Sequence, residues 1–310
     1  MVIKMYIVDS HCDSICAVDD GKYGLVNPYN FSQKHNQLQF VAMYCSDTPE
    51  ESYKRTVRYI GHFAIAMANE GDKILPVKTY ADIERAFAEG KHAALLAIEG
   101  GSGIKGSRKI FKEFYNVGVR VFGLAWLSND LAKSNRLEEG EEDTGLTELG
   151  KTIIADGNEL GMIFDVSHLS DKSFWDTAEL SKKPIIASHS NFRTLCGHSR
   201  NLTDEMAREI FRQDGMIGLN LCTAFIHEEK SQRTVEMLFK HLDHCLALGG
   251  EDHIGFGGDI DGIESYPAPL TQERSVHDQL IELMLKANYS EELVNKVAYE
   301  NYMRFLKKYL

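Results

Sequence analysis

The fold of this chain is decided near its start, by the stretch Met5-Tyr6-Ile7-Val8-Asp9-Ser10-His11-Cys12-Asp13. A short apolar run of strand character ends there in polar residues. His11 and Asp13 are two positions apart, so in extended backbone both side chains point to the same side. An imidazole and a carboxylate on one face form half of a metal site. The alternative is that these residues only shape a turn, so the outcome depends on whether the chain supplies further ligands.

Apolar runs of strand character recur along the chain and are separated by helical patterns. Most are short and lack clean alternation, as expected for parallel strands that are buried on both faces. The predicted strands are 5–8, 38–44, 93–98, 119–125, 162–166, 184–187, 216–221 and 254–256.

Helical patterns fill the gaps, and several begin at residues that favour a helix N-terminus. Start signals are Thr79 with Asp82, Thr203 before two acidic residues, and Ser290. The predicted helices are 53–68, 81–89, 108–116, 146–160, 173–180, 204–212, 234–248, 272–287 and 291–309.

This alternation predicts an α/β fold, a closed (β/α)8 TIM barrel. We expect a single domain over 1–310, with C-terminal helices over 272–309. The main alternative is an open doubly wound sheet, which would need a glycine-rich nucleotide-binding turn after its first strand. His-Cys-Asp stands there instead, which disfavours that alternative.

Composition narrows the classes of protein that the chain can belong to. A net charge of -12 and a pI near 5.5 argue against nucleic-acid binding and favour a small polar substrate. The six cysteines show no Cys-x-x-Cys spacing, as expected for reduced thiols in the cytoplasm. No segment approaches the roughly 20 apolar residues that span a bilayer, and the run 1–6 is too short for a signal peptide. The acidic run 138–143 is predicted to be a solvated loop, with selection of charged substrates as a minor alternative.

Candidate ligands occur where a barrel requires them, after the C-terminal ends of the predicted strands. Singly, each could cap a helix or a turn. Together they form a set of imidazoles and carboxylates, which are ligands of zinc and similar divalent ions. Five protein ligands exceed what one catalytic zinc ion uses. We therefore expect two divalent metal ions, Zn²⁺, with one carboxylate bridging them. The predicted metal ligands are His11, Asp13, Glu99, His168 and His189.

Such a site suits hydrolysis. Water held between two cations loses a proton near neutral pH, and the cations polarise the carbonyl under attack. Asp259 is the expected general base and acid, which returns the proton to the departing amine; its alternative role is a final metal ligand. Glu99 is counted as catalytic because of its bridging position. Asp261 is expected only to shape the turn with Gly262.

The segment 191–201 is expected to bind substrate. Arg200 suits a substrate carboxylate because guanidinium meets carboxylate in a bidentate fork. His198 and Asn201 are candidate substrate-binding residues beside it. Arg193 is expected to pair with a surface acid instead.

A series of sequence blocks spans nearly the whole chain, namely 9–13, 98–101, 145–150, 159–168, 187–191, 198–201, 255–262 and 300–304. In order and content they resemble the membrane (renal) dipeptidase family of zinc peptidases, within the amidohydrolase-like barrels. The resemblance implies one zinc ion held by His11, Asp13 and Glu99, and a second held by His168, His189 and the same Glu99.

The resemblance also implies what the protein does. It implies Arg200 on the dipeptide carboxylate and Asp259 as the acid/base group. It further implies hydrolysis of free dipeptides, commonly with tolerance for a D-residue at the C-terminal position, and a homodimer, which is also the commonest assembly of soluble enzymes.

One segment departs from the family pattern. After the fourth strand the family often reads Leu-Thr-His-Asn, whose histidine helps to stabilise the tetrahedral intermediate, whereas this chain has Trp126 in the corresponding segment. An indole can donate one hydrogen bond but cannot replace a cationic donor. Either the metals carry more of the oxyanion here, as a Trp at this position in bacterial relatives suggests, or another group has taken over. Trp126 is therefore a candidate substrate-binding residue that could equally be wall packing.

The sequence therefore predicts a cytoplasmic two-zinc dipeptidase. The alternatives are a related amidohydrolase that acts on N-acyl amino acids or another small amide or lactone, and a non-catalytic binding protein on a decayed barrel. Because successive side chains of a strand point to opposite sides, we expect Cys12, which lies between the candidate ligands His11 and Asp13, to point away from the metals.

Overall fold

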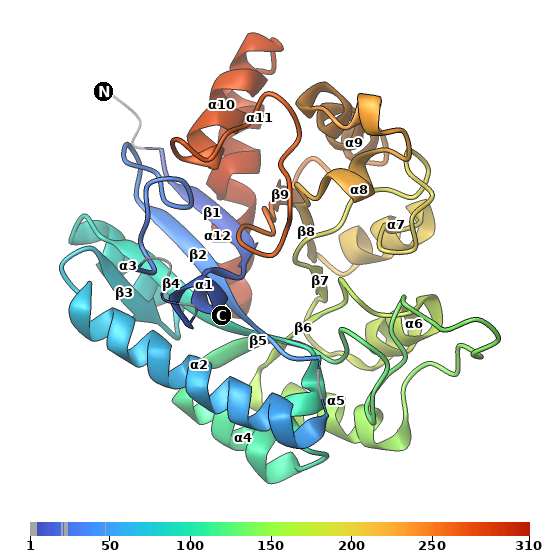
Figure 1. Cartoon of the computed structure of the whole chain (residues 1–310). Helices are drawn as coiled ribbons and strands as arrows, with labels where there is room; N and C mark the ends of the chain where they lie inside the picture. The colour runs from blue at the N-terminus through green and yellow to red at the C-terminus, as the bar shows by residue number, and fades with distance from the viewer. Residues whose placement is uncertain (1–4, 20, 22–23, 47) are drawn as a thin grey trace.

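Eight parallel strands close into a barrel with helices around its outside (Figure 1). The computed structural model describes residues 5–19, 21, 24–46 and 48–310, so most of the run 1–6 lies outside the described residues. Pairing of β2 with β4 closes the ring. The fold prediction is confirmed. The barrel strands are β1 (Ile7–Cys12), β2 (Gln37–Tyr44), β4 (His92–Glu99), β5 (Val119–Gly123), β6 (Ile163–Asp165), β7 (Ile186–Ala187), β8 (Met216–Leu219) and β9 (Ile254–Phe256).

A further strand, β3 (Ile74–Val77), was not predicted. It pairs with the first half of β4, while β5 pairs with the second half. Because β3 lies at an edge, it tolerates Pro76, which lacks a backbone donor.

The predicted helices are present with some shifted ends, and two short helices, Ser14–Asp19 and Thr223–Ile226, were not predicted. Thr79 and Asp82 form a capping box, and Thr203 and Ser290 cap their helices as predicted. The helix predicted over 53–68 begins earlier, at Pro49, because Thr48 caps it and Pro49 is favourable in a first helical turn. The α-helices are α1 (Ser14–Asp19), α2 (Pro49–Asn69), α3 (Tyr80–Ala88), α4 (Arg108–Val117), α5 (Glu148–Leu160), α6 (Asp171–Leu180), α7 (Asp204–Arg212), α8 (Thr223–Ile226), α9 (Val235–Ala247), α10 (Val276–Lys286), α11 (Glu291–Asn295) and α12 (Asn301–Tyr309).

Shorter helical turns complete the chain. Two are 3₁₀-helices, η1 (Gly101–Ile104) and η2 (Lys230–Gln232), and one is a π-helical turn, η3 (Lys296–Glu300), which joins α11 to α12. The predicted helix 291–309 is therefore present with an internal π-turn. Among the described residues, none of the helices combines the length and apolar character needed to cross a membrane.

Buried side chains form two clusters. One contains alternate strand residues such as Val8 and Phe40, together with Tyr302 and Phe305 of α12. The other lies between the strands and the surrounding helices and contains Cys12. Both faces of the strands are thus buried, which explains their near-continuous apolar sequences.

A bulge in β1 aims the first ligand. The register with β2 shifts between Asp9 and Cys12, where β1 has one residue more than its partner. Ser10 donates a hydrogen bond to the carbonyl oxygen of Ser188, inside the barrel, and the next residue, His11, turns toward the site. Cys12 is fully buried in the outer cluster, as alternation predicted.

Candidate metal centre

The ends of four strands bring the five predicted ligands together. They come from the end of β1, the end of β4 and the loops after β6 and β7, and all five are buried. The residues brought together are His11, Asp13, Glu99, His168 and His189.

Glu99 lies at the centre of this group. Its Oε1 atom is 2.7 Å from Nε2 of His168, 3.3 Å from Nε2 of His189 and 3.6 Å from Nε2 of His11. Nε2 of His11 is in turn 3.5 Å from Oδ2 of Asp13. One carboxylate therefore faces three imidazoles, the position that a bridging ligand requires.

Three sets of donor atoms are close enough to hold a cation, each with its atoms within 4.8 Å of one another. The first is His11, Asp13 and Glu99, and the second is Glu99, His168 and His189. The third combines His11 and His189 with Asp259. Because the first two sets share Glu99, the arrangement fits two adjacent metal ions.

The charges of the site also fit a cation. Burial, then Arg200, lowers the pKa of His168 to about 3, so its ring is neutral and has a free lone pair. Burial opposes a charge on His11, but Glu99 and Asp13 raise its pKa well above the usual value. Nε2 of His11 is buried and has no hydrogen-bond partner in the described part of the chain. The carboxylates of Glu99 and Asp13 thus favour a positive charge at the point where imidazole nitrogens are available to bind a cation.

Hydroxyl and carboxylate groups behind the ligands orient His189. Its Nδ1 atom is 2.7 Å from the hydroxyl of Ser188, which donates to Asp165. Asp165 also accepts from the backbone N–H of Ser188 at 2.9 Å and from the hydroxyl of Ser167 at 2.7 Å. Since the Ser188 hydrogen goes to Asp165, its oxygen accepts from Nδ1–H of His189, which leaves Nε2 free to bind a metal.

Asp259 lies on a strained turn beside the ligands. Its φ of 54° is uncommon for a non-glycine residue, and such strain persists where the surroundings hold it. Its N–H donates to the carbonyl oxygen of His11 at 3.1 Å, and Oδ2 accepts from Asn220 at 3.1 Å. Burial raises the pKa of Asp259, His11 opposes this, and Glu99 adds to it. A Cβ at Gly262 would meet Oδ2 of Asp13 at 2.1 Å and Oδ1 of Asp259 at 2.6 Å, so glycine leaves room for both carboxylates.

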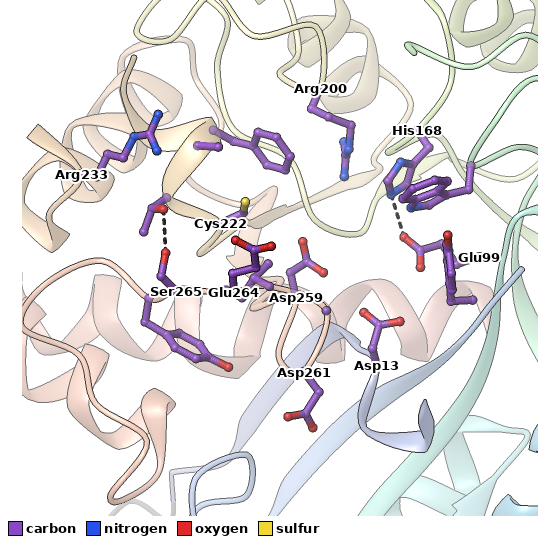
Figure 2. A pocket seen from close by; sticks show the side chains of 18 of the residues that line it. Asp13, Glu99, His168, Arg200, Cys222, Arg233, Asp259, Asp261, Glu264 and Ser265 are labelled. Carbon is purple, nitrogen blue, oxygen red and sulfur yellow. Dashed lines mark hydrogen bonds and ion pairs between the residues drawn. The ribbon is translucent and has the colours of Figure 1, made fainter. Parts of the chain in front are cut away.

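A cavity of about 940 Å³ opens over the ligands. Its two sides differ in charge: Arg200 and Arg233 lie across from Asp13, Asp259 and Glu264 (Figure 2). A molecule with a positive and a negative end can therefore bind in one orientation.

Arg200 is only 2% exposed and is already tied to the loops that carry two ligands. Its guanidinium donates to the carbonyl oxygens of Ser167 and His189 and to the hydroxyl of Ser190. Nε of Arg200 has no partner among the described residues. Arg200 can thus both position the loops and offer a donor to a substrate.

Two predicted substrate-binding residues do not line the cavity. His198 is not among its lining residues, and its Nδ1 accepts the backbone N–H of Arg200 at 3.1 Å. Asn201 is also absent from the lining and donates to the carbonyl oxygens of Cys196 and Phe225, each at 2.9 Å. Both contact the turn that carries Arg200, and their part in substrate binding stays a prediction.

Arg193, Asp261 and the acidic run 138–143 were expected to have roles other than metal binding or catalysis. Arg193 pairs with Asp171 at 2.8 Å, as expected for a surface arginine. Asp261 accepts a hydrogen bond from Tyr29 and has a φ of 69°, consistent with a turn-shaping part. The acidic run 138–143 belongs to no helix or strand, and Asp143 in it caps the start of α6 by accepting from the backbone N–H of Lys172 at 3.0 Å.

Trp126 lines the cavity beside the ligands. Its ring lies 5.7 Å from that of His168 and 4.8 Å from that of Tyr44. The guanidinium carbon of Arg136 is 3.9 Å from the Trp126 ring centre. Nothing in the sequence indicates that Arg136 belongs to the site, because it lies ten positions after Trp126 and is part of no motif.

A closed barrel with imidazoles and carboxylates gathered at the C-terminal ends of its strands defines a barrel-type metal-dependent hydrolase. Residues 1–309 match the family model described as membrane dipeptidase, peptidase family M19. The chain belongs to this family and is a metallo-dipeptidase by class.

Similar proteins come from bacteria and a fungus. The chain is 35% identical over 234 residues to an uncharacterized protein in the pqqA 5′ region of Klebsiella pneumoniae, which covers 73% of this chain and 86% of that protein. It is 31% identical over 227 residues to dipeptidase tcpJ of Claviceps purpurea, covering 73% of this chain but 53% of the fungal protein.

Solved structures share the fold. A metallo peptidase from Rhodobacter sphaeroides, liganded with a phosphinate mimic of L-Ala-D-Ala, has 24% identity and a TM-score of 0.88, and the match covers 99% of this chain and all of the other. The probable dipeptidase PvdM of Pseudomonas aeruginosa has 19% identity and a TM-score of 0.86, with coverage of 99% and 96%.

Proposed function

We propose that this protein hydrolyses free dipeptides, including dipeptides with a D-residue at the C-terminal position, and that it does so with two zinc ions. The observation that carries the proposal is the pair of donor sets that share Glu99. In a member of the membrane dipeptidase family, such a pair fits a binuclear hydrolytic site.

We assign the metal ligands as the sequence predicted them. His11, Asp13 and Glu99 would hold one ion, and Glu99, His168 and His189 the other. A mixed set of imidazoles and carboxylates suits zinc. When bound, the two ions supply Lewis acidity and lower the pKa of water.

The cavity supplies the orientation of the substrate. The ammonium group of a dipeptide suits Glu264 on the acidic side, and its carboxylate suits the side formed by Arg200 and Arg233 (Figure 2). This orientation places the peptide bond between the acidic and the basic side of the cavity.

Asp259 is the group that moves the proton. Its carboxylate is 4.0 Å from Nε2 of His11 and is held by Asn220, so it lies beside the ligands with a fixed orientation. It accepts a proton from the attacking water and returns it to the nitrogen of the departing amine.

A substrate panel and a metal determination test the proposed function. We expect two zinc ions per chain by elemental analysis, and turnover of L,L- and L,D-dipeptides in preference to N-acyl amino acids and lactones. Turnover of one of the other classes without any dipeptide would contradict the proposal. A chain that binds clearly less than one divalent ion would contradict both enzyme assignments.

The Arg200→Ala variant tests recognition of the substrate carboxylate. We expect kcat/KM for free dipeptides to fall by about 10- to 100-fold, mainly through KM, because one charged hydrogen bond is lost. Amidated dipeptides should lose much less. Metal content is measured in parallel, because Arg200 also holds the carbonyl oxygen of His189. An equal loss on free and amidated substrates would show that Arg200 acts only by positioning the loops.

We further propose that the protein is a cytoplasmic homodimer. All six cysteines are free in the structure, which suits a reducing compartment, and dimers are the commonest assembly of soluble enzymes. The mass in solution by light scattering checks the dimer.

A further inference from the structure

The cavity holds more positive charge than one substrate carboxylate needs. Its lining includes four cations, Arg136, Arg200, Lys230 and Arg233, of which Arg200 and Arg233 form the basic side described above. Within the part of the chain that the structure describes, none of these four is paired with a carboxylate. The protein as a whole has a net charge of -12, so this side of the cavity is a local reversal of sign.

The four cations differ in how far their donors are already used. Arg200 donates to two carbonyl oxygens and a hydroxyl, and Arg233 donates to the carbonyl oxygens of His227 and Glu228 at 2.8 and 3.2 Å. The guanidinium of Arg136 has no acceptor among the described residues. Its five N–H groups are therefore available to a ligand.

Stacking holds Arg136 in place without using those donors. Its guanidinium carbon lies 3.9 Å from the centre of the Trp126 ring, and Trp126 is itself held against Tyr44 and His168. A guanidinium on an aromatic face keeps the N–H groups at its edge free for a planar, bidentate partner. Arg136 and Lys230 are both exposed, but Lys230 has no such platform and is a flexible point charge by comparison.

Arg136 and Arg200 line the same cavity and are linked through one of the ligand loops. The Trp126 ring beneath Arg136 lies 5.7 Å from the ring of His168, and Arg200 donates to the carbonyl oxygen of Ser167, the residue before His168. Burial, then Arg200, Arg136 and Arg233, lower the pKa of His198, which agrees with the three guanidinium groups lying near one another. A second anionic group bound by Arg136 would thus lie near the carboxylate bound by Arg200.

The cavity has room for such a group. Its volume of about 940 Å³ is at the upper end of the range of about 300–1,000 Å³ for small-molecule pockets. A dipeptide whose C-terminal residue has a long or charged side chain therefore fits on the basic side.

We propose that Arg136, stacked on Trp126, determines specificity by binding the side-chain carboxylate of a C-terminal Asp or Glu in the dipeptide. This rests on the proposed dipeptidase function and narrows it to acidic dipeptides. It also gives Trp126 a role at the position where the resembling family often has a histidine: the indole is a platform for a guanidinium, not a donor to the intermediate.

A matched pair of substrates tests the proposal. Ala-Asp and Ala-Asn, in the stereochemistry that the enzyme accepts, have the same shape and differ by one charge. We expect the wild type to prefer Ala-Asp. The Arg136→Gln variant should lower kcat/KM for Ala-Asp by about 10- to 100-fold, mostly through KM, and change that for Ala-Asn by less than about threefold. Arg136→Lys, which keeps the charge but loses the fork, should restore part of the preference.

A control variant removes an equal charge elsewhere. Arg208 is exposed on α7 and is not among the residues that line the cavity, so Arg208→Gln should leave the preference unchanged. An equal loss of kcat on both substrates in Arg136→Gln would overturn the proposal in favour of a donor to the intermediate. No change on either substrate would show that Arg136 only covers Trp126. Failure of the wild type to hydrolyse any dipeptide would refute the proposed function itself, whereas turnover without preference for Ala-Asp would refute only the acidic specificity.

Discussion

Replacing Glu99 with Gln should remove both metal ions and, with them, all but a small residue of hydrolysis. One oxygen of Glu99 lies 2.7 to 3.6 Å from the Nε2 atoms of His11, His168 and His189. Glu99 is also the one residue shared by the two donor sets that we assign to the metal ions. Gln has nearly the same shape but carries no charge, and its amide nitrogen is not a ligand. We expect kcat/KM to fall by about 10³-fold or more, since the metals supply both the nucleophile and the polarisation of the carbonyl.

The measurement that checks this prediction is the metal content of the purified variant, determined together with its activity. Circular dichroism shows whether the barrel remains folded without the charge. Glu99→Asp is the matched control: it keeps the charge, shortens the side chain, and should retain more metal than Gln. Two ions per chain in Glu99→Gln would show that Glu99 does not bridge them.

The strands of the barrel could be predicted because each is buried on both faces. A run such as 93–98 reads as continuous apolar sequence, and burial of this kind needs no long-range information. β3 escaped prediction because Pro76 interrupts a short run, and only its pairing with the edge of β4 makes it a strand. The bulge in β1 could not be foreseen either, because it depends on the register with β2.

The candidate ligands could be found because barrel topology brings strand ends together. Glu99 and His189 are 90 residues apart, yet each follows a predicted strand, and closure of the barrel does the rest. Closeness in sequence is a weaker guide. His198 and Asn201 are neighbours of Arg200 in the chain, but neither lines the cavity: Nδ1 of His198 and the side-chain NH₂ of Asn201 bind backbone groups.

Residues that support the site carry no sequence signal of their own. Asp165 stands in the same block as His168, but only the structure shows that it holds Ser188, which in turn orients His189. Arg136 is recognised only through its stacking on Trp126. Side-chain partners across a barrel are set by packing, which one sequence does not reveal.

Replacing Asp259 with Asn should leave both metal ions bound and remove turnover. The change keeps the size of the side chain and an oxygen that can accept the hydrogen bond from Asn220, so the turn should be preserved. What is lost is the ability to accept and return a proton, which contributes about 10²- to 10⁴-fold. Because αL backbone is favourable for Asn, the φ of 54° should not oppose the substitution.

The matched control for this prediction lies two residues further on. Asp261 lines the same cavity with the same kind of backbone, at a φ of 69°, so Asp261→Asn makes the same chemical change in the same loop. It should keep most of the turnover, because Asp261 is engaged by Tyr29 and not by the ligands. Since His11, His189 and Asp259 also form a possible donor set, loss of metal in Asp259→Asn would instead identify Asp259 as a ligand. Full metal content with undiminished turnover would mean that another group carries the proton to the departing amine.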